Sequence, residues 1–156
     1  MERIIGTADT PLIEYVNDVW KVRWGGQKQE DGGVLYNEVS FPFKPSVDNI
    51  KDIILSIENL EIDNKILSGY VWKGMSVWLS SENQFNYKAA YDLAVQTNCS
   101  NLPVTFKFGD TDNPKYYTFD SLSDLSDFYA GAMTFVNQTL SEGWTNKDSI
   151  DWSKYE

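Results

Sequence analysis

The 156-residue sequence contains no histidine. Histidine is the most common general base, the usual partner of a nucleophilic serine or cysteine, and a frequent ligand of transition metals. The only cysteine, Cys99, has no second thiol with which to form an internal disulfide and no histidine to activate it. We therefore interpret Cys99 as structural or incidental, and the sequence predicts a protein that is not an enzyme.

Other signals of ligand binding are also missing. The glycine pairs at 25–26 and 32–33 lack the spacing and the Lys-Ser/Thr pair of a phosphate-binding loop. The segment 109–113 lacks the length and the distal glutamate of a calcium loop, and its Asp and Asn residues before a proline are typical of a turn. No catalytic residue, cofactor or metal ligand is therefore predicted.

Positive charge and long apolar stretches are both scarce. The chain has 23 acidic and 13 basic residues, for a net charge of −10. Such a charge repels nucleic acids and anionic membranes but suits a neutral or cationic partner. Without an apolar stretch in its first residues, the chain is predicted to have neither a signal peptide nor a membrane anchor. We expect a soluble protein whose partners are other proteins.

Aromatic residues, in contrast, are abundant at 15% of the chain. Some will fill the core, but Trp and Tyr are also favoured at protein interfaces, where their rigid rings bury a large area. The residues predicted as partner contacts are Trp20, Trp24, Trp144, Trp152 and Tyr155. Two alternatives also use these residue types. Flat rings at Trp20, Trp24, Trp72 and Trp144 would suit a carbohydrate-binding domain, and a pair among the many carboxyls would suit glycoside hydrolysis, although the sequence identifies no such pair.

The first 45 residues have the pattern of β-strands. Trp20, Val22 and Trp24 alternate with polar residues, which is the period of a half-buried strand. A turn-rich segment follows, and 35–43 is again extended, with Val39, Phe41 and Phe43 expected on one face. The pattern predicts a β-hairpin in a strand-rich segment, residues 1–45.

The remaining residues, 46–156, are predicted to form an α+β domain in one compact unit with the first segment. The predicted order is a helix over 46–60, a short hairpin of strands 66–72 and 76–79, a helix from a capping box at Ser81 and Gln84 to about 97, strands over 104–108 and 115–119, and a long helix over 122–142. Gly143 is expected to end the last helix. The fold class is therefore α+β, with an N-terminal β-hairpin segment followed by helix, short hairpin, helix, two strands and a long C-terminal helix.

The same pattern gives one apolar row and two predictions of packing. The helix after Ser81 carries an apolar row at Phe85, Ala89, Ala90, Leu93 and Ala94, with Tyr87 and Tyr91 on a neighbouring face. Trp78 and Leu79 are expected to be buried where this helix begins. The aromatic segment 144–156 is expected to fold back on the chain, and docking on a neighbouring subunit is the alternative.

Several segments together are similar to a known family. They are 69–80 (GYVWKGMSVWLS), 86–88 (NYK), the strand pair 102–119, and a closing helix ending at Gly143 and Trp144. The chain resembles, over roughly 47–151, a bacteriophage domain of unknown function found in tail-fibre-assembly-like and tail-associated proteins, including those of gut Bacteroides-type phages. Residues 1–45 lie outside the resemblance.

The resemblance implies a function and a location. It implies a virion-associated structural protein of the tail or tail fibre, acting through protein–protein contacts, or alternatively a tail-fibre assembly chaperone. The expected partners are other virion or tail-fibre proteins, or further copies in a homo-oligomer. The expected location is the phage virion or the cytoplasm of the infected bacterial host.

Overall fold

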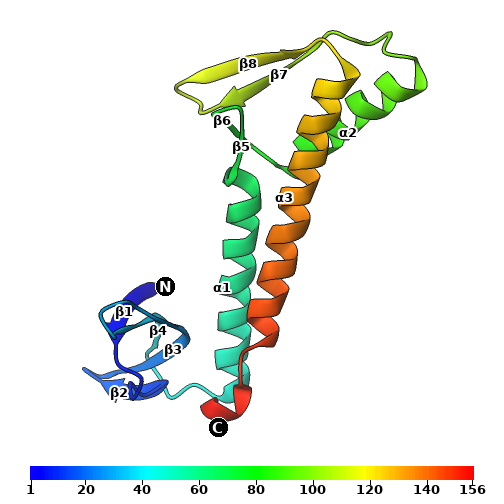
Figure 1. Ribbon diagram of the computed structural model, residues 1–156. Helices are drawn as coiled ribbons and strands as arrows, with labels where there is room; N and C mark the ends of the chain where they lie inside the picture. Colours follow the sequence, from blue (N-terminus) through cyan, green and yellow to red (C-terminus); the bar gives the residue numbers. More distant parts are fainter. The chain divides into compact units, whose positions relative to one another are not determined.

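The computed structural model describes residues 1–156 and confirms the α+β fold (Figure 1). The elements are β1 (Glu2–Gly6), β2 (Ile13–Val16), β3 (Val19–Lys28), β4 (Val34–Phe41), α1 (Val47–Ser68), β5 (Tyr70–Trp72), β6 (Met75–Val77), α2 (Ser81–Gln96), β7 (Val104–Gly109), β8 (Pro114–Phe119), α3 (Leu122–Asp148) and the 3-10 helix η1 (Trp152–Tyr155). No helix is both long and apolar enough to cross a membrane.

The chain divides into two compact units. Unit 1 contains residues 1–60 and 143–156, and unit 2 contains residues 61–142. The division runs through α1 and α3, so it does not coincide with the boundary predicted at residue 45. It follows that the strand-rich segment shares its core with the first part of α1 and with the last residues of the chain.

Unit 1 is built on a four-stranded antiparallel sheet in the order β1-β4-β3-β2. The predicted hairpin is β3 and β4, in which Trp20 pairs with Phe41. Because side chains alternate across a strand, Val22 and Trp24 point into the core while Arg23 lies on the opposite face. Phe43 lies beyond the end of β4 and is 54% exposed, so the prediction that the strand includes it was wrong, although its ring contacts that of Phe41 at 5.9 Å between centroids.

The core of unit 1 joins the sheet, α1 and the C-terminal segment. Its buried residues are Val22, Trp24, Ile50, Ile54 and Tyr155. The helical stripe predicted for α1 is therefore confirmed, because Ile50 and Ile54 are fully buried. The predicted fold-back of the last segment is also confirmed, since Ile150 and Trp152 pack against the same cluster.

Unit 2 packs two β-hairpins and α2 against α3 around an aromatic core. Phe128 of α3 lies at its centre, with Phe108, Phe119 and Tyr87 within 4.9–5.2 Å of its ring centroid. The tight turn predicted at Lys73-Gly74 is confirmed, with φ values of 45° and 77° that suit a two-residue hairpin.

Two helices are longer than predicted. α1 continues through Ser68, so residues 66–68 are helical rather than extended, and the helix closes where the Gly69 N–H donates to the Lys65 carbonyl at 2.9 Å. α3 continues past Gly143 to Asp148. Glycine inside a helix lowers the stability of the helix by only about 1 kcal/mol relative to alanine. The helical turns on both sides of Gly143 outweigh this loss.

The start of α2 differs by one residue from the prediction. Ser80, rather than Ser81, is the N-cap, and its hydroxyl accepts from the Asn83 N–H at 3.2 Å. Leu79 is buried as predicted, but Trp78 is 53% exposed, so the prediction that it is buried was wrong. The chain is extended here, and Val77 and Leu79 point inward, which directs the residue between them outward.

Candidate interaction surface

The inward face of α2 is formed by tyrosines and alanine. Tyr87 is 3% exposed, and its ring centroid lies 4.8 Å from that of Phe106 and 4.9 Å from that of Phe128. Burial raises the pKa of Tyr87 to about 12. Tyr91 stacks on Tyr129 of α3 at 5.2 Å with an interplanar angle of 23°. These ring contacts determine which side of α2 meets the core of unit 2.

The opposite face of α2 is apolar and exposed. Phe85 is 69% exposed, Leu93 is 46% exposed, and Ala89 between them is also exposed. Positions four residues apart lie one above another on a helix, so these three residues form a single line, which we call the α2 stripe. The predicted apolar row exists, but its largest members face solvent, while Ala94 faces the core.

Hydrogen bonds hold both ends of α2. At the N-terminal end, the Gln84 side chain donates to the Leu79 carbonyl at 2.8 Å. At the C-terminal end, the Leu93 carbonyl accepts from the Thr97 N–H at 2.9 Å and from its hydroxyl at 2.7 Å. Asn101 donates to the Ala90 carbonyl at 3.1 Å. The α2 stripe is therefore presented on a fixed helix, which lowers the entropy lost when a partner binds.

Charged groups border the stripe on one side. Lys88 and Asp92 form an ion pair one helical turn apart, and the side chains are 55% and 39% exposed. The hydrogen bond to Asp92 raises the pKa of Lys88. Trp78 adds exposed apolar surface before the N-terminal end of α2, where its carbonyl accepts from the Asn83 amide at 2.8 Å.

Two of the residues predicted as partner contacts belong instead to the core of unit 1. Trp24 is 2% exposed, and its indole N–H donates to Glu58 at 2.6 Å. Tyr155 is 4% exposed, and its hydroxyl donates to the Arg23 carbonyl. The interface role predicted for Trp24 and Tyr155 is corrected, because buried side chains offer a partner no surface.

The other three predicted contacts retain solvent-facing surface. Trp20 is half-buried beside Tyr15, with 5.3 Å between ring centroids, and Trp152 is half-buried with the Lys51 ammonium 5.7 Å from its ring. Trp144 on α3 is 55% exposed. Of the tryptophans predicted for sugar binding, Trp24 packs into the core of unit 1 and Trp72 packs against the core of unit 2, so neither offers a flat exposed ring.

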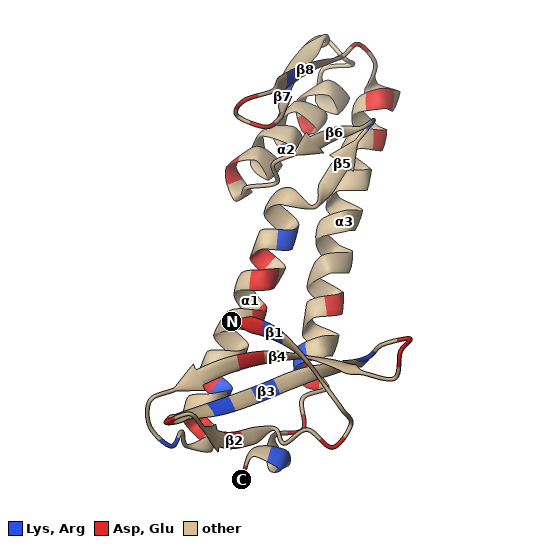
Figure 2. Ribbon diagram, turned by 90° about the vertical axis from the view of Figure 1, so that its left-hand side faces the viewer, with Lys and Arg blue, Asp and Glu red and all other residues tan.

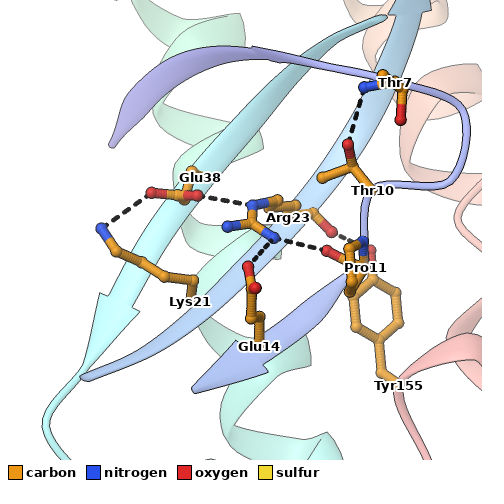
Figure 3. Close-up of polar contacts among 8 residues, drawn as sticks. All are labelled: Thr7, Thr10, Pro11, Glu14, Lys21, Arg23, Glu38 and Tyr155. Carbon is orange, nitrogen blue, oxygen red and sulfur yellow. Dashed lines mark hydrogen bonds and ion pairs between the residues drawn. The ribbon is translucent and has the colours of Figure 1, made fainter. Parts of the chain in front are cut away.

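The unit 1 sheet carries an ionic network that the sequence did not reveal. It lies on the face opposite to Val22 and Trp24 (Figure 3). The Arg23 guanidinium donates to Glu38 at 2.7 Å and to the Pro11 carbonyl at 2.8 Å, and it pairs with Glu14 at 2.9 Å. Lys21 pairs with Glu38 at 2.9 Å. Arg23 is 6% exposed because the β1–β2 connection crosses this face, which strand alternation alone could not predict.

The network is fully paired and therefore structural. Burial opposes ionisation of Glu38, but hydrogen bonds from Lys21 and Arg23 outweigh it, and the pKa of Glu38 lies below its usual value. Burial likewise opposes the charge on Arg23, yet Glu38 and Glu14 raise its pKa. Every charged group in the network has a partner of opposite charge, which leaves none free to act on a ligand.

A second polar cluster joins elements of unit 2. Lys73, at the β5–β6 turn, pairs with Asp124 of α3 at 2.7 Å, and the Tyr117 hydroxyl of β8 donates to the same carboxyl at 2.6 Å. The hydrogen bond from Lys73 is the main reason that the pKa of Asp124 is lowered. The three groups satisfy one another's charge and hydrogen-bonding capacity. We therefore interpret the cluster as a structural contact that connects the two hairpins to α3.

Acidic and basic residues are distributed along the chain rather than gathered into one patch (Figure 2). The structure contains no group of three or more His, Cys, Asp or Glu side chains that could hold a metal ion. Among these surfaces, the α2 stripe combines large apolar side chains, high exposure and a fixed backbone.

No protein-family model, curated protein or solved structure significantly matches this chain.

Proposed function

We propose that this chain is a non-enzymatic component that works through protein–protein contacts and that the α2 stripe is its contact surface. The observation that carries the proposal is the 69% exposure of Phe85 on a helix whose other face is fixed by the core. Hot spots of protein interfaces are enriched in large, rigid side chains that enter a partner's pocket. Phe85 has the size and the accessibility for this role.

The energetics favour a covered stripe. Removing a Phe or Leu side chain from water contributes roughly 1.5–3 kcal/mol, so Phe85 and Leu93 together supply a meaningful share of a binding free energy. Phe85 is largely exposed and Leu93 about half exposed in the isolated chain. Both side chains would gain this contribution only when a partner covers them.

Charge narrows the kind of partner. The chain carries a net charge of −10, so it repels acidic proteins at long range, and the charges at the contact itself decide which partner surface fits. At the stripe itself the charges of Lys88 and Asp92 cancel, and the other charged residue of α2 is Glu82, exposed three residues before Phe85. The partner face that fits this surface is therefore apolar at its centre and not acidic beside Glu82.

We further propose that the biological setting is a bacteriophage particle, with the chain as a structural protein of the tail or tail fibre. The support is the resemblance of residues 47–151 to tail-associated phage domains. A tail-fibre assembly chaperone is the alternative within the same class. Both proteins would use a contact surface, but a chaperone leaves the finished particle.

Quantitative mass spectrometry of purified virions separates these two roles. Phage particles would be grown from the genome that encodes this chain and purified. The copy number of the chain in the particles would then be compared with that of the major tail proteins. We expect a fixed copy number in the particle. Its absence from the particle, together with defective fibres when the gene is deleted, would instead identify a chaperone. If the genes adjacent to this one encode only metabolic enzymes and no phage proteins, both roles would be excluded.

A matched pair of variants tests whether the stripe is the surface involved. Phe85 and Tyr116 are both aromatic and exposed to 69% and 68%, but Tyr116 lies on β8, away from α2. The gene deletion would be complemented with Phe85→Gln or with Tyr116→Gln. We expect only Phe85→Gln to reduce incorporation into particles. Equal incorporation of both variants would exclude the α2 stripe as the contact surface.

A further inference from the structure

The α2 stripe has a pattern that is complementary to itself. Large side chains, Phe85 and Leu93, stand at its two ends, and the small Ala89 stands at its centre. We propose that the α2 stripe binds the α2 stripe of a second copy of this chain, with the two helices antiparallel and Ala89 at the two-fold axis. This inference rests on the proposed function, because it names the partner of the same contact surface.

The spacing along the helix supports the antiparallel pairing. An α-helix rises about 1.5 Å per residue, so Phe85 and Leu93 each lie about 6 Å from the level of Ala89, in opposite directions. In an antiparallel pair, Phe85 of one copy therefore lies opposite Leu93 of the other. The two Ala89 residues meet at the centre, where their small side chains let the helices approach to the usual 8–10 Å. A parallel pair would instead set Phe85 against Phe85.

The charged border of the stripe is complementary under the same symmetry. Lys88 and Asp92 lie along the same edge of the helix. A two-fold axis at Ala89 keeps this edge on the same side of the pair and reverses its direction. Lys88 of one copy then lies within about 3 Å, along the axis, of the level of Asp92 in the other. Two ion pairs between copies can form, and these contacts oppose the long-range repulsion between two copies that each carry a net charge of −10.

An isologous contact of this kind repeats each interaction twice. Symmetric dimers are the most common form of homo-oligomer, and every favourable contact in them occurs in two copies. Here the repeated contacts are Phe85 on Leu93 and Lys88 beside Asp92. A protein that assembles into a repeated structure gains a defined building block from such a pair.

The first test measures the mass of the full-length chain by sedimentation over a range of concentrations. Ala89→Arg would place two guanidinium groups against each other at the two-fold axis, whereas Ala130→Arg changes an exposed alanine of α3. We expect the unmodified chain and Ala130→Arg to reach the dimer mass, and Ala89→Arg to remain a monomer whose melting temperature equals that of the unmodified chain when both are measured as dilute monomers. A monomer at every concentration, or a dimer unaffected by Ala89→Arg, would overturn the proposal.

The second test exchanges the charges at the border. Lys88→Asp and Asp92→Lys each place like charges across the interface, so each is expected to weaken the dimer about tenfold. The double variant Lys88→Asp/Asp92→Lys restores opposite charges and should recover the original dissociation constant. The antiparallel register would be contradicted if the single variants leave the dissociation constant of the dimer unchanged. It would also be contradicted if the double variant weakens the dimer by the combined effect of the two single substitutions.

The third test reads the register by disulfide formation in a Cys99→Ser background. Two cysteines can bond only when their Cα atoms lie within about 7 Å. Ala89→Cys should therefore cross-link to itself under mild oxidation. Phe85→Cys should not, because the two Phe85 positions are about 12 Å apart along the axis. A mixture of Phe85→Cys and Leu93→Cys should give the mixed dimer.

The outcomes separate this proposal from the proposed function. A chain that stays monomeric in solution, and that occurs at a fixed copy number in particles, would overturn the self-pairing and leave the virion role standing. A chain that forms the Ala89-centred dimer, and that never enters a particle, would do the opposite. Self-cross-linking of Phe85→Cys without cross-linking of Ala89→Cys would overturn the proposed register.

Discussion

The hydroxyl of Tyr155 donates a hydrogen bond of 2.8 Å to the main-chain carbonyl of Arg23, and both residues are buried. The two residues are separated by 132 positions in the sequence. The bond fastens η1 to the central strand β3, directly beside the ionic network of Arg23 and Glu38 (Figure 3). The last aromatic residues are therefore part of the core of unit 1.

Substitutions at Tyr155 should separate the contribution of the hydroxyl from that of the ring. Tyr155→Phe keeps the ring and leaves the Arg23 carbonyl without this donor, for an expected loss of about 1 kcal/mol in the free energy of unfolding. Tyr155→Ala also empties the site and should cost about 3–5 kcal/mol. Urea denaturation measures both values. Trp144→Ala, at an exposed position, serves as the control and should change stability by less than about 0.5 kcal/mol.

Removal of residues 149–156 tests the same conclusion for the whole segment. Ile150, Trp152 and Tyr155 would all leave the core of unit 1. We expect a clearly lower melting temperature and no change in the mass of the species in solution, measured by light scattering. A lower mass with an unchanged melting temperature would show that the segment docks on another copy instead.

Acid should weaken unit 1 through Glu38. Its pKa in the folded chain lies below the ordinary value of 4.5, so the unfolded chain takes up the proton first as the pH falls. The stability contributed by the ionised carboxylate is therefore complete above pH 4.5 and is lost as the pH falls toward the lower folded pKa. Glu38→Gln should cost about 3 kcal/mol at neutral pH, since it breaks a buried pair.

The difference between the unmodified chain and Glu38→Gln should shrink in acid. Denaturation at a series of pH values measures this difference directly. Glu142→Gln, at the exposed pair with Lys65, provides a control whose effect should stay within about 1 kcal/mol. A Glu38→Gln difference that stays constant from neutral pH to well below 4.5 would show that the carboxylate of Glu38 is not held ionised by its partners.

Neighbouring residues at the start of α2 should respond very differently to truncation. Leu79 is 1% exposed, and Leu79→Ala should cost about 2–5 kcal/mol. Trp78 is 53% exposed, and Trp78→Ala should change the free energy of unfolding by no more than about 0.5 kcal/mol. Thermal and urea denaturation of the two variants compares them. A large loss for Trp78→Ala would mean that its ring packs against the chain in solution.

The periodicity of apolar residues in the sequence predicted most of the helices and strands, because each of these elements turns one regularly spaced face toward a core. The alternation of Trp20, Val22 and Trp24 and the helical spacing of Ile50 and Ile54 each reflect contact with a single core face, and both were confirmed. Helix ends were harder to predict. Gly143 lies inside α3 because tertiary packing outweighs a weak local preference for ending the helix.

The contact surface was harder to predict than the fold. The row of Phe85, Ala89 and Leu93 is visible in the sequence, but α2 has a second apolar face at Tyr87 and Ala94. The choice between the two faces depends on the ring of Phe128, which is distant in sequence and meets Tyr87 in the core. Likewise, Trp24 is as aromatic as Trp144, and only the packing of unit 1 shows that Trp24 is unavailable to a partner.

Pairing of two copies of this chain through the outward faces of α2 is tested by amide hydrogen exchange of the full-length chain at rising protein concentration. We expect peptides covering Phe85, Ala89 and Leu93 to exchange more slowly as the concentration rises, because pairing of the helices suppresses their local opening. Peptides from β7 and β8, including Tyr116, should exchange at an unchanged rate. If exchange in α2 is the same at every concentration, or slows equally in β7 and β8, two copies do not pair through this face of α2.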